Sequence, residues 1–354
     1  MKFDKIQMTV VLSNRKDIMD RAYNFYPVNH SAIIAQLGKE KLIEALKWML
    51  LIRNFETRAE ASYQQGKIGG FFHAYIGQEA IQVGAVMALG VENWYITSYR
   101  CHALALLLGA TPNELMAELF GRATGNAKGR GGSMHFFTER LLGGFGIVTG
   151  QVPIATGAAF TLKYKEIKDE AAICFLGDGA VPQGAFHESL NLAALWDLPC
   201  MYVIENNQWG MGTHVSRAVS VPRLAEDKAP GYNMKGYTLD GMDFIGCYGA
   251  FKEIYQEVLD TQRPVLIEAL TERFKGHSIS DPGLYRTKDD LKLRMQRDPI
   301  IIFQQTLIEH GVMDAETIKK MDQEMRQRVI EAIDYADRSP WPDPISLEED
   351  VFAP

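Results

Sequence analysis

Residues 171–179 read AAICFLGDG, and residues 201–207 read MYVIENN. Each stretch is an apolar run of strand length that ends in a polar side chain, Asp178 in the first and Asn207 in the second. Between them, residues 183–196 have the length and pattern of one helix. A strand, a helix and a second strand form a βαβ unit, whose two strands run parallel. The pattern therefore predicts an α/β fold with a central, mostly parallel sheet flanked by helices.

The two polar side chains are expected to lie close together, because the carboxyl ends of parallel strands meet at one edge of the sheet and α/β proteins bind ligands there. A carboxylate and an amide oxygen suit Mg²⁺, which usually completes its octahedron with substrate phosphates. Taken singly, Asp178 could cap a helix and Asn207 could form a turn. Their joint placement at successive strand ends favours a site for a metal ion and a pyrophosphate.

Composition excludes several classes of function. The 354 residues are 47% hydrophobic and 23% charged, as in ordinary globular proteins. The net charge of -7 argues against a nucleic-acid partner, which needs a basic face. No run approaches the roughly 18 apolar residues of a membrane span, and no targeting pattern is visible at the N-terminus. We therefore expect a cytoplasmic protein with no membrane partner, whose four dispersed cysteines are reduced.

Three parts are expected along the chain: an irregular N-terminal arm over residues 1–38, one α/β domain over residues 39–340 and a tail over residues 341–354. Within the domain, residues 121–150 contain nine glycines and no clear period. We expect a long loop there whose backbone approaches a ligand closely, although a flexible surface loop is the alternative. Residues 274–287 are predicted to form a polar loop.

The GDG motif followed by NN at this spacing resembles the signature of thiamin diphosphate enzymes. The surrounding sequence resembles the α subunit of the E1 component of 2-oxo acid dehydrogenase complexes, most closely in the pyruvate dehydrogenase branch, over roughly residues 40–340. The resembling segments are GGFFHAYIGQEA (69–80), ITSYRCH (96–102), AKGRGGSM (127–134), GGFGIVTGQVP (143–153), NNQWGMGT (206–213) and GHSISDPGLYR (276–286).

The resemblance implies the thiamin diphosphate-binding fold, with thiamin diphosphate and Mg²⁺ as cofactors. It implies three metal ligands: the side chains of Asp178 and Asn207 and the main-chain carbonyl of Trp209. The family often has Tyr where Trp209 stands, a change that a carbonyl ligand tolerates. The other residues implied to bind the cofactor are Tyr99, Arg100, Gly146, Val148, Gly177, Gly179, Ala180 and His277.

Some of these assignments have a physical reason and a plain alternative. Arg100 could grip a diphosphate with two parallel hydrogen bonds, or it could be a surface residue. Gly179 and Ala180 are expected to open a helix whose N-terminal amides meet the pyrophosphate. By resemblance, Gly146 and Val148 offer carbonyls to the 4′-amino group of the aminopyrimidine, although core packing is the alternative.

Two histidines are implied to be catalytic. His73 is expected near the substrate carboxylate, and His277 near the diphosphate and thiazolium end of the cofactor. His102 is a weaker candidate, and His135 has no assigned role. The segment after Gly276 carries phosphoserines in animal relatives; Ser278 and Ser280 are present here, but the other usual sites are not, so an unregulated loop is the better interpretation.

The chain is expected to carry half of an active site. Thiamin chemistry needs a carboxylate at N1′ of the pyrimidine, and the sequence shows no second α/β half that could supply it. The resemblance places that Glu on an E1 β subunit, which implies an α2β2 heterotetramer; a lipoyl domain of E2 is the second implied partner. The small-residue helix around residues 155–159 is the expected contact surface.

The resemblance implies decarboxylation of pyruvate and reductive acetylation of the lipoyl group of E2. Acetoin dehydrogenase α and branched-chain 2-oxo acid E1 α are the enzymatic alternatives, and a non-catalytic scaffold subunit is the alternative from another class. The stretch Phe71-Phe72-His73 and the compact loop after Gly276 favour a small 2-oxo acid substrate. Intact Asp178 and Asn207 argue against the scaffold.

Overall fold

The computed structural model describes residues 23–349 and 351. A six-stranded sheet lies at its centre, with spatial order β2-β1-β3-β4-β8-β7 and parallel pairing throughout. The predictions of an α/β fold and of a parallel sheet are confirmed. The strands are β1 (Trp94–Ser98), β2 (Leu141–Phe145), β3 (Ala172–Gly177), β4 (Cys200–Asn206), β7 (Lys235–Asp240) and β8 (Val265–Leu270), with a small antiparallel pair, β5 (Trp209–Gly210) and β6 (Thr213–His214).

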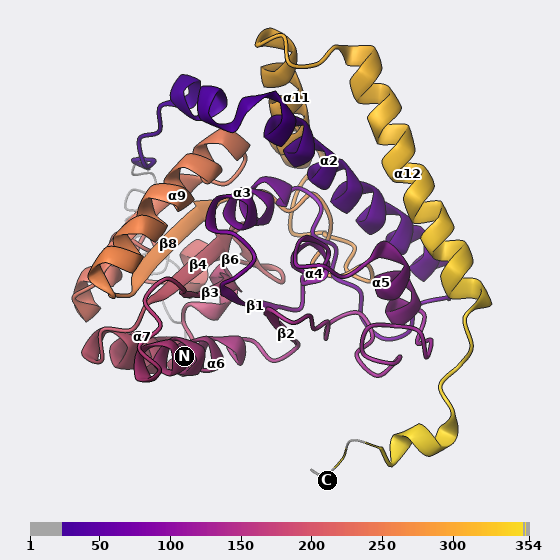
Figure 1. Cartoon of the computed structure of the whole chain (residues 1–354), viewed down its shortest axis with the longest axis horizontal. Coiled ribbons are helices and arrows are strands. Elements are labelled where there is room, and N and C mark those ends of the chain that lie inside the picture. Colours follow the sequence, from indigo (N-terminus) through magenta and orange to yellow (C-terminus); the bar gives the residue numbers. More distant parts are fainter. Residues whose placement is uncertain (1–22, 350, 352–354) are drawn as a thin grey trace, which may run out of the picture.

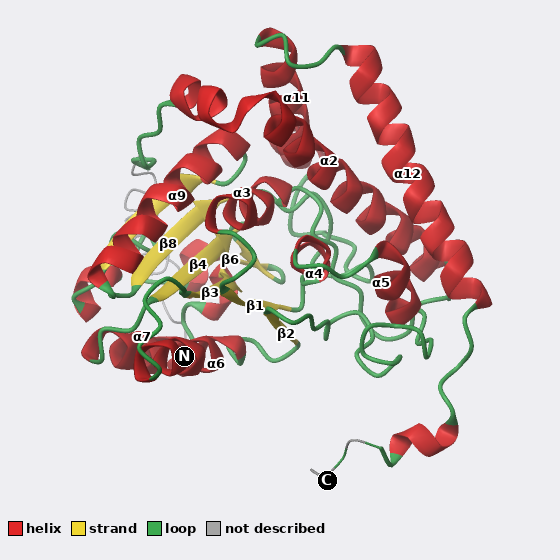
Figure 2. Ribbon diagram, viewed as in Figure 1, coloured by secondary structure: helices red, strands yellow, loops and turns green. Residues whose placement is uncertain are grey.

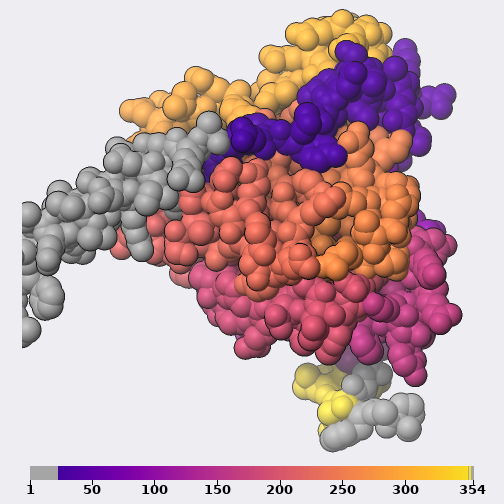
Figure 3. Space-filling model, turned by 90° about the vertical axis from the view of Figure 1, so that its left-hand side faces the viewer, coloured from indigo at the N-terminus to yellow at the C-terminus, as the bar shows by residue number. Residues whose placement is uncertain are grey.

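Helices cover both faces of the sheet (Figures 1 and 2). Helices α6 and α7 lie on one face and α3 and α9 on the other, while α2, α11 and α12 form a further layer beyond α3. From the side, the N-terminal part of α2 lies across the top of the molecule, above the segment that contains α9 (Figure 3). The helices are α2 (His30–Gln64), α3 (Glu79–Leu89), α4 (His102–Leu107), α5 (Pro112–Leu119), α6 (Gln151–Tyr164), α7 (Gly184–Leu195), α8 (Val215–Ala218), α9 (Phe244–Thr261), α10 (Lys288–Met295), α11 (Pro299–Glu309) and α12 (Ala315–Arg338).

None of the helices within residues 23–349 is long and apolar enough to cross a membrane.

The sequence of strand β3 is apolar throughout because both faces of the strand are buried. Successive side chains of a strand point to opposite faces. Ile173 and Phe175 therefore enter the larger core, shared with α2, α3 and α9, whereas Ala172, Cys174 and Leu176 enter the second core beneath α6 and α7. A parallel strand that is buried on both faces has no solvent-facing position for a polar residue.

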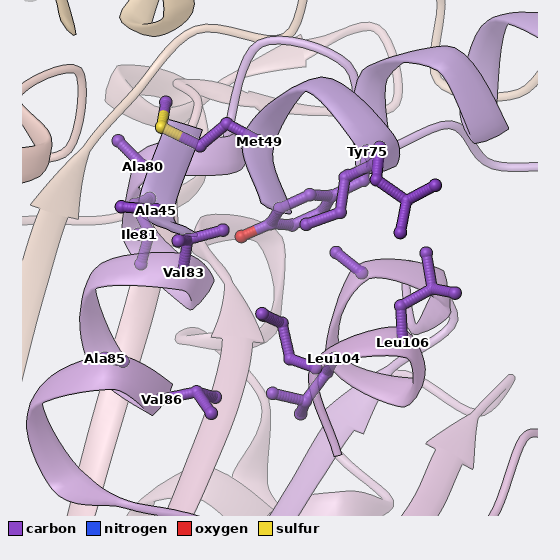
Figure 4. Packing of buried hydrophobic residues seen from close by; sticks show 14 of the residues in the cluster. Ala45, Met49, Tyr75, Ala80, Ile81, Val83, Ala85, Val86, Leu104 and Leu106 are labelled. Atoms are coloured by element: carbon purple, nitrogen blue, oxygen red, sulfur yellow. The ribbon is translucent and has the colours of Figure 1, made fainter. Parts of the chain in front are cut away.

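The larger core reaches the carboxyl edge of the sheet through Tyr75. Its ring is fully buried in one cluster with Met49, Val83 and Leu104, from α2, α3 and α4 (Figure 4). Its hydroxyl donates a short hydrogen bond to the carboxylate of Glu205, near the end of β4. Core packing therefore fixes a polar group at the sheet edge where ligands are expected.

The N-terminal arm differs from the prediction. Irregular chain was expected to residue 38, but α2 begins at His30, capped by Asn29, and continues past a break at Gly38, which has φ 67°. The early turn forms because it buries Ile33 and Leu37 in the larger core. Tertiary burial outweighs weak local propensity here. Residues 1–22 of the expected arm lie outside the described residues.

The glycine-rich segment also differs, because it contains strand β2, whose sequence is LLGGF. Glycine is disfavoured in strands, so this edge strand gives no local signal. A Cβ on Gly144 would lie 2.6 Å from the sulfur of Cys101. The glycine therefore permits close packing between the strand and the chain beside it.

Helix packing gives a test of the fold. A Cβ on buried Gly84 of α3 would lie 2.9 Å from the Cβ of Cys247 on α9, whereas one on Gly157 of α6 would meet nothing within 4 Å. We expect Gly84→Ala to lower the free energy of unfolding by roughly 1–2 kcal/mol, since overpacking outweighs the better helix propensity. The matched Gly157→Ala should raise it by up to about 1 kcal/mol. Urea denaturation of the chain without a partner measures both, and equal stability of the two variants would contradict this packing.

Candidate active site

Five parallel strands end at one cavity of about 990 Å³. The cavity is lined by residues that come one to three positions after these strands: Arg100 (β1), Gly146 (β2), Asp178 (β3), Asn207 (β4) and Arg273 (β8). The cavity therefore lies at the carboxyl edge, where parallel sheets bind ligands.

Every residue that the sequence assigned to the site lines this cavity. What each of them binds stays a prediction, but the structure brings together segments from most of the chain. They are His73, Tyr99, Arg100, Gly146, Val148, Gly177, Asp178, Gly179, Ala180, Asn207, Trp209 and His277.

The expected metal corner is made of hard oxygen donors. Asp178 is only 2% exposed, and the Asn207 side chain is fixed because its Nδ2 donates to Oε1 of Gln78 at 2.9 Å. The Oδ1 of Asn207 also accepts the main-chain N–H of Trp209 at 3.2 Å. Within residues 23–349, no cluster of three His, Cys, Asp or Glu side chains could hold a metal. One carboxylate, one amide oxygen and one carbonyl fit Mg²⁺ that takes its other ligands from phosphate and water.

Burial raises the pKa of Asp178 to about 7, although the positive charges of Arg273 and Arg100 oppose the shift. The ionised carboxylate is thus poorly stabilised by the protein alone. A cation bound beside it would favour the ionised form.

Arg273 was not found by sequence reasoning, although it follows a buried strand as Asp178 and Asn207 do. Its guanidinium is almost fully buried and joins two loops around the cavity. It donates to the carbonyls of Trp209 and Lys275 at 3.1 and 3.2 Å and to the hydroxyl of Tyr285 at 2.7 Å. The carbonyl of Trp209, the predicted third metal ligand, is therefore held in place by Arg273.

Arg100 is buried, which rules out the alternative of a surface arginine. It donates to the carbonyls of Ala74 and His277, each at 2.7 Å. Burial, together with the charge of Arg273, lowers its pKa to about 10, so it stays protonated at neutral pH. The guanidinium thus supplies charge to the cavity and fixes the backbone of the loop that carries His277.

The two predicted catalytic histidines lie next to each other. The rings of His73 and His277 are 5.1 Å apart, and the ring of Tyr99 lies 4.4 Å from that of His73. Burial and the nearby Arg100 charge lower the pKa of His73 to about 3 and that of His277 to about 4, so both rings are neutral at pH 7. The Nδ1 atoms of both are buried and have no hydrogen-bond partner among the described residues. They can bond to a ligand without first displacing a protein group.

Two expectations need correction or a new interpretation. Gly179 and Ala180 do not open a long helix: they form a 3-10 turn, and α7 begins only at Gly184. Pro182 lacks the N–H that a continuous helix would use. His102 lies outside the cavity and pairs with buried Glu56 at 2.9 Å.

Two further polar residues of the cavity were missed. Glu205, beside the metal corner, accepts hydrogen bonds from Tyr75 and from Gln82, and burial raises its pKa to about 7. Gln78 orients Asn207 from the start of α3, and its own Nε2 has no partner among the described residues. Glu205 was missed because it ends a run of residues that was interpreted only as a strand. Gln78 was missed because its segment, residues 69–80, was used only to identify the resemblance.

A family model described as "Dehydrogenase E1 component" matches residues 47–345. The chain belongs to the dehydrogenase E1 family. E1 dehydrogenases are oxidoreductases that depend on thiamin diphosphate, and the cavity fits that group: a polar corner for a diphosphate, two buried arginines and unpartnered buried ring nitrogens.

Relatives match this E1 chain over nearly its whole length. "Pyruvate dehydrogenase E1 component subunit alpha" of Rickettsia conorii is 43% identical over 89% of this chain and 96% of the relative. The protein of the same name from Rhizobium meliloti is 41% identical over 90% of this chain and 92% of the relative. "Pyruvate dehydrogenase E1 component subunit alpha-3, chloroplastic" of Oryza sativa is 38% identical, over 92% of this chain and 77% of the relative.

The raised pKa of Asp178 predicts a pH-dependent stability cost. Below its ordinary pKa of 3.8 the carboxyl is protonated in both states. As the pH rises, the unfolded chain ionises first, and the folded carboxyl keeps its proton until about pH 7, so folding loses free energy across that window. In the E1 chain without ligands, we expect Asp178→Asn to be more stable than wild type by roughly 2–4 kcal/mol at pH 8 and nearly equal to it at pH 4. Denaturation at both pH values measures this, and a difference independent of pH would contradict the buried assignment.

Proposed function

We propose that this E1 chain is the α subunit of a pyruvate dehydrogenase. With thiamin diphosphate and Mg²⁺ it would decarboxylate pyruvate and transfer the acetyl group to the lipoyl group of an E2 protein. The observation that carries the proposal is the convergence of all twelve predicted residues on one cavity, in a chain whose near-full-length relatives bear that name. We also propose a cytoplasmic location, as expected from the sequence.

The chain's own residues would bind and orient. Asp178, the amide oxygen of Asn207 and the carbonyl of Trp209 would hold Mg²⁺ and, through it, the diphosphate. Thiamin diphosphate, when bound, supplies the nucleophilic carbon and the electron sink for decarboxylation. Arg100 and Arg273 would place positive charge around the diphosphate end of the cavity.

The two histidines would act as neutral hydrogen-bonding groups. Because the pKa of His73 is about 3 and that of His277 about 4, neither ring is in the protonated imidazolium form at neutral pH. A neutral imidazole can donate one hydrogen bond and accept another. We propose that His73 orients the substrate carboxylate and that His277 bonds to the cofactor, held there by the link from Arg100 to its carbonyl.

The carboxylate that must meet the pyrimidine is proposed to come from an E1 β subunit. The carboxylates lining the cavity from the described residues are Asp178, Glu205 and Asp281. Glu205 is bound by Tyr75 and Gln82, and Asp281 accepts from the main-chain N–H of His277 and from the hydroxyl of Tyr285. None of the three lies within residues 146–148, the segment expected to bind the aminopyrimidine.

The open side of the cavity supports a partner there. Its lining includes apolar side chains that a monomer would leave in water, Met211 at 65% exposed and Phe71 at 60%, and Ile147, between the lining residues Gly146 and Val148, is 77% exposed. A covering subunit would bury them and complete the site, and an obligate interface of this kind buries roughly 2,000 Å² or more. We propose an α2β2 heterotetramer, because two-fold symmetry is the usual arrangement of soluble oligomers.

The contact surface expected around residues 155–159 of α6 is only partly exposed. Ala155, Thr156 and Ala159 of α6 are buried, whereas Gly157 is exposed and faces open space. The outer face of α6 and α7 is instead rich in exposed apolar side chains, with the rings of Phe160 and Trp196 5.6 Å apart. Its exposed members are Ile154, Phe160, Tyr164, Leu192, Leu195 and Trp196. We propose this face, together with the exposed Gly157 of the expected segment 155–159, as a further subunit contact.

Substrate choice tests the proposed function against its enzymatic alternatives. The chain combined with its β subunit is assayed with each substrate. We expect kcat/KM for pyruvate to exceed kcat/KM for branched-chain 2-oxo acids by at least about tenfold, because the extra methylenes of the branched-chain acids must fit a pocket proposed to hold a small acyl group. Acetoin is assayed in parallel under the same conditions. Faster turnover of acetoin or of a branched-chain acid would assign the chain to that alternative.

The half-site proposal predicts strict dependence on the partner. The purified chain alone should show no turnover of pyruvate, and addition of the β subunit should restore it, because the N1′ carboxylate is then supplied. Sedimentation of the mixture checks for an α2β2 species. Full activity of the isolated chain would show that it contains its own carboxylate, whereas an inactive complex that binds no cofactor would support the scaffold alternative.

A further inference from the structure

The glycine-rich segment wraps around one buried carboxylate. Glu118 of α5 is fully buried and makes no ion pair within residues 23–349. One of its oxygens accepts the main-chain N–H groups of Ala127 and Gly129, both at 2.9 Å. The other accepts those of Gly131 at 2.6 Å and Gly132 at 3.3 Å. Four backbone donors therefore surround a single anion, in a segment that has neither helix nor strand.

The glycines are required by this wrapping. A Cβ on Gly125 would lie 2.6 Å from the Cα of Glu118, and one on Gly129 would lie 2.8 Å from the carbonyl oxygen of Gly121. One on Gly131 would collide with the carbonyl oxygen of His135. These glycines approach protein atoms, so the expectation that they approach a ligand is wrong for them. Hydrogen bonds to an ionised acceptor are stronger than those between neutral groups, and here they replace regular secondary structure.

The segment continues directly into the cofactor cavity. His102 lies 2.9 Å from the carbonyl of Ser133, and the hydroxyl of Ser133 donates to the carbonyl of Phe71, so the chain is held on both sides. Met134, the next residue, lines the cavity. The N–H of Gly144 in β2 then donates to the carbonyl of Phe136 at 3.2 Å, which ties this segment to the strand.

We propose that Glu118 is a positioning residue for the cofactor site. Its carboxylate holds residues 127–132 in the conformation that places Met134 on the cavity wall and aligns β2, whose end delivers Gly146 and Val148. It touches neither substrate nor cofactor and acts through the backbone. The expected effect on cofactor binding rests on the proposed function. The claim that Glu118 fixes residues 127–132 does not.

The test uses the chain assembled with its β subunit and compares Glu118→Gln with wild type. The neutral amide keeps the shape but replaces one acceptor oxygen by an NH₂ group that faces two N–H donors. Hydrogen exchange of the amides of residues 127–132, measured without cofactor, is expected to be at least about tenfold faster in the variant. The apparent KM for thiamin diphosphate is expected to rise while kcat at saturating cofactor stays unchanged.

Leu115→Ala is the matched control, because Leu115 is fully buried on the same helix but its apolar side chain accepts no hydrogen bond from the four N–H donors. It should lower the melting temperature without changing the exchange of residues 127–132 or the KM for thiamin diphosphate. Unchanged exchange in Glu118→Gln, or an equal rise in KM in the control, would overturn the proposal. If Glu118→Gln does not assemble, hydrogen exchange of the wild type tests the proposal instead. The four amides that bond to Glu118 must then be protected from exchange, and exchange as fast as in open loops would overturn the proposal. Because exchange is measured without cofactor, a wild type that binds no thiamin diphosphate would contradict the proposed function separately.

Discussion

Parallel pairing along the centre of the sheet places the whole site. In the register of β3, β4 and β8, Gly177 pairs with Glu205 and Asn206 pairs with Leu270, so these strands end level with one another. Each strand is buried on both faces and can present polar groups only where it ends. The residues that follow must therefore meet at one edge, and that edge forms the wall of the cavity.

The resulting site is electrostatically unfavourable for the protein alone. Asp178 is desolvated, and its pKa rises to about 7; Arg100 is also desolvated, and its pKa falls to about 10. Buried charges of this kind cost folding free energy unless a ligand compensates them. Mg²⁺ beside the carboxylate and a diphosphate beside the arginines would each supply the missing charge. Such a trade of stability for function is common at binding sites.

Hydrogen bonds from buried charged side chains to backbone carbonyls and amides fix the segments around the cavity. Arg273 holds the carbonyl of Trp209, Arg100 holds that of His277, and Glu118 collects four N–H groups of the glycine-rich segment. In each case a buried charged side chain fixes a segment that lies outside the helices and the central sheet. The cavity is thereby shaped before a ligand arrives, while apolar side chains of its lining, such as Met211 and Phe71, stay exposed.

The sequence by itself determined the α/β class, the βαβ unit and the positions of Asp178 and Asn207, because apolar runs and the polar residues that end them are local patterns. It also predicted that no cysteine is in a disulfide, and in the structure all four cysteines are free and buried. Only the tertiary structure decided that Arg273 holds a carbonyl 64 residues away, that LLGGF forms an edge strand and that the glycines enclose Glu118. These features depend on hydrogen bonds and close contacts between distant segments, and no local periodicity records which partner a buried charge will find.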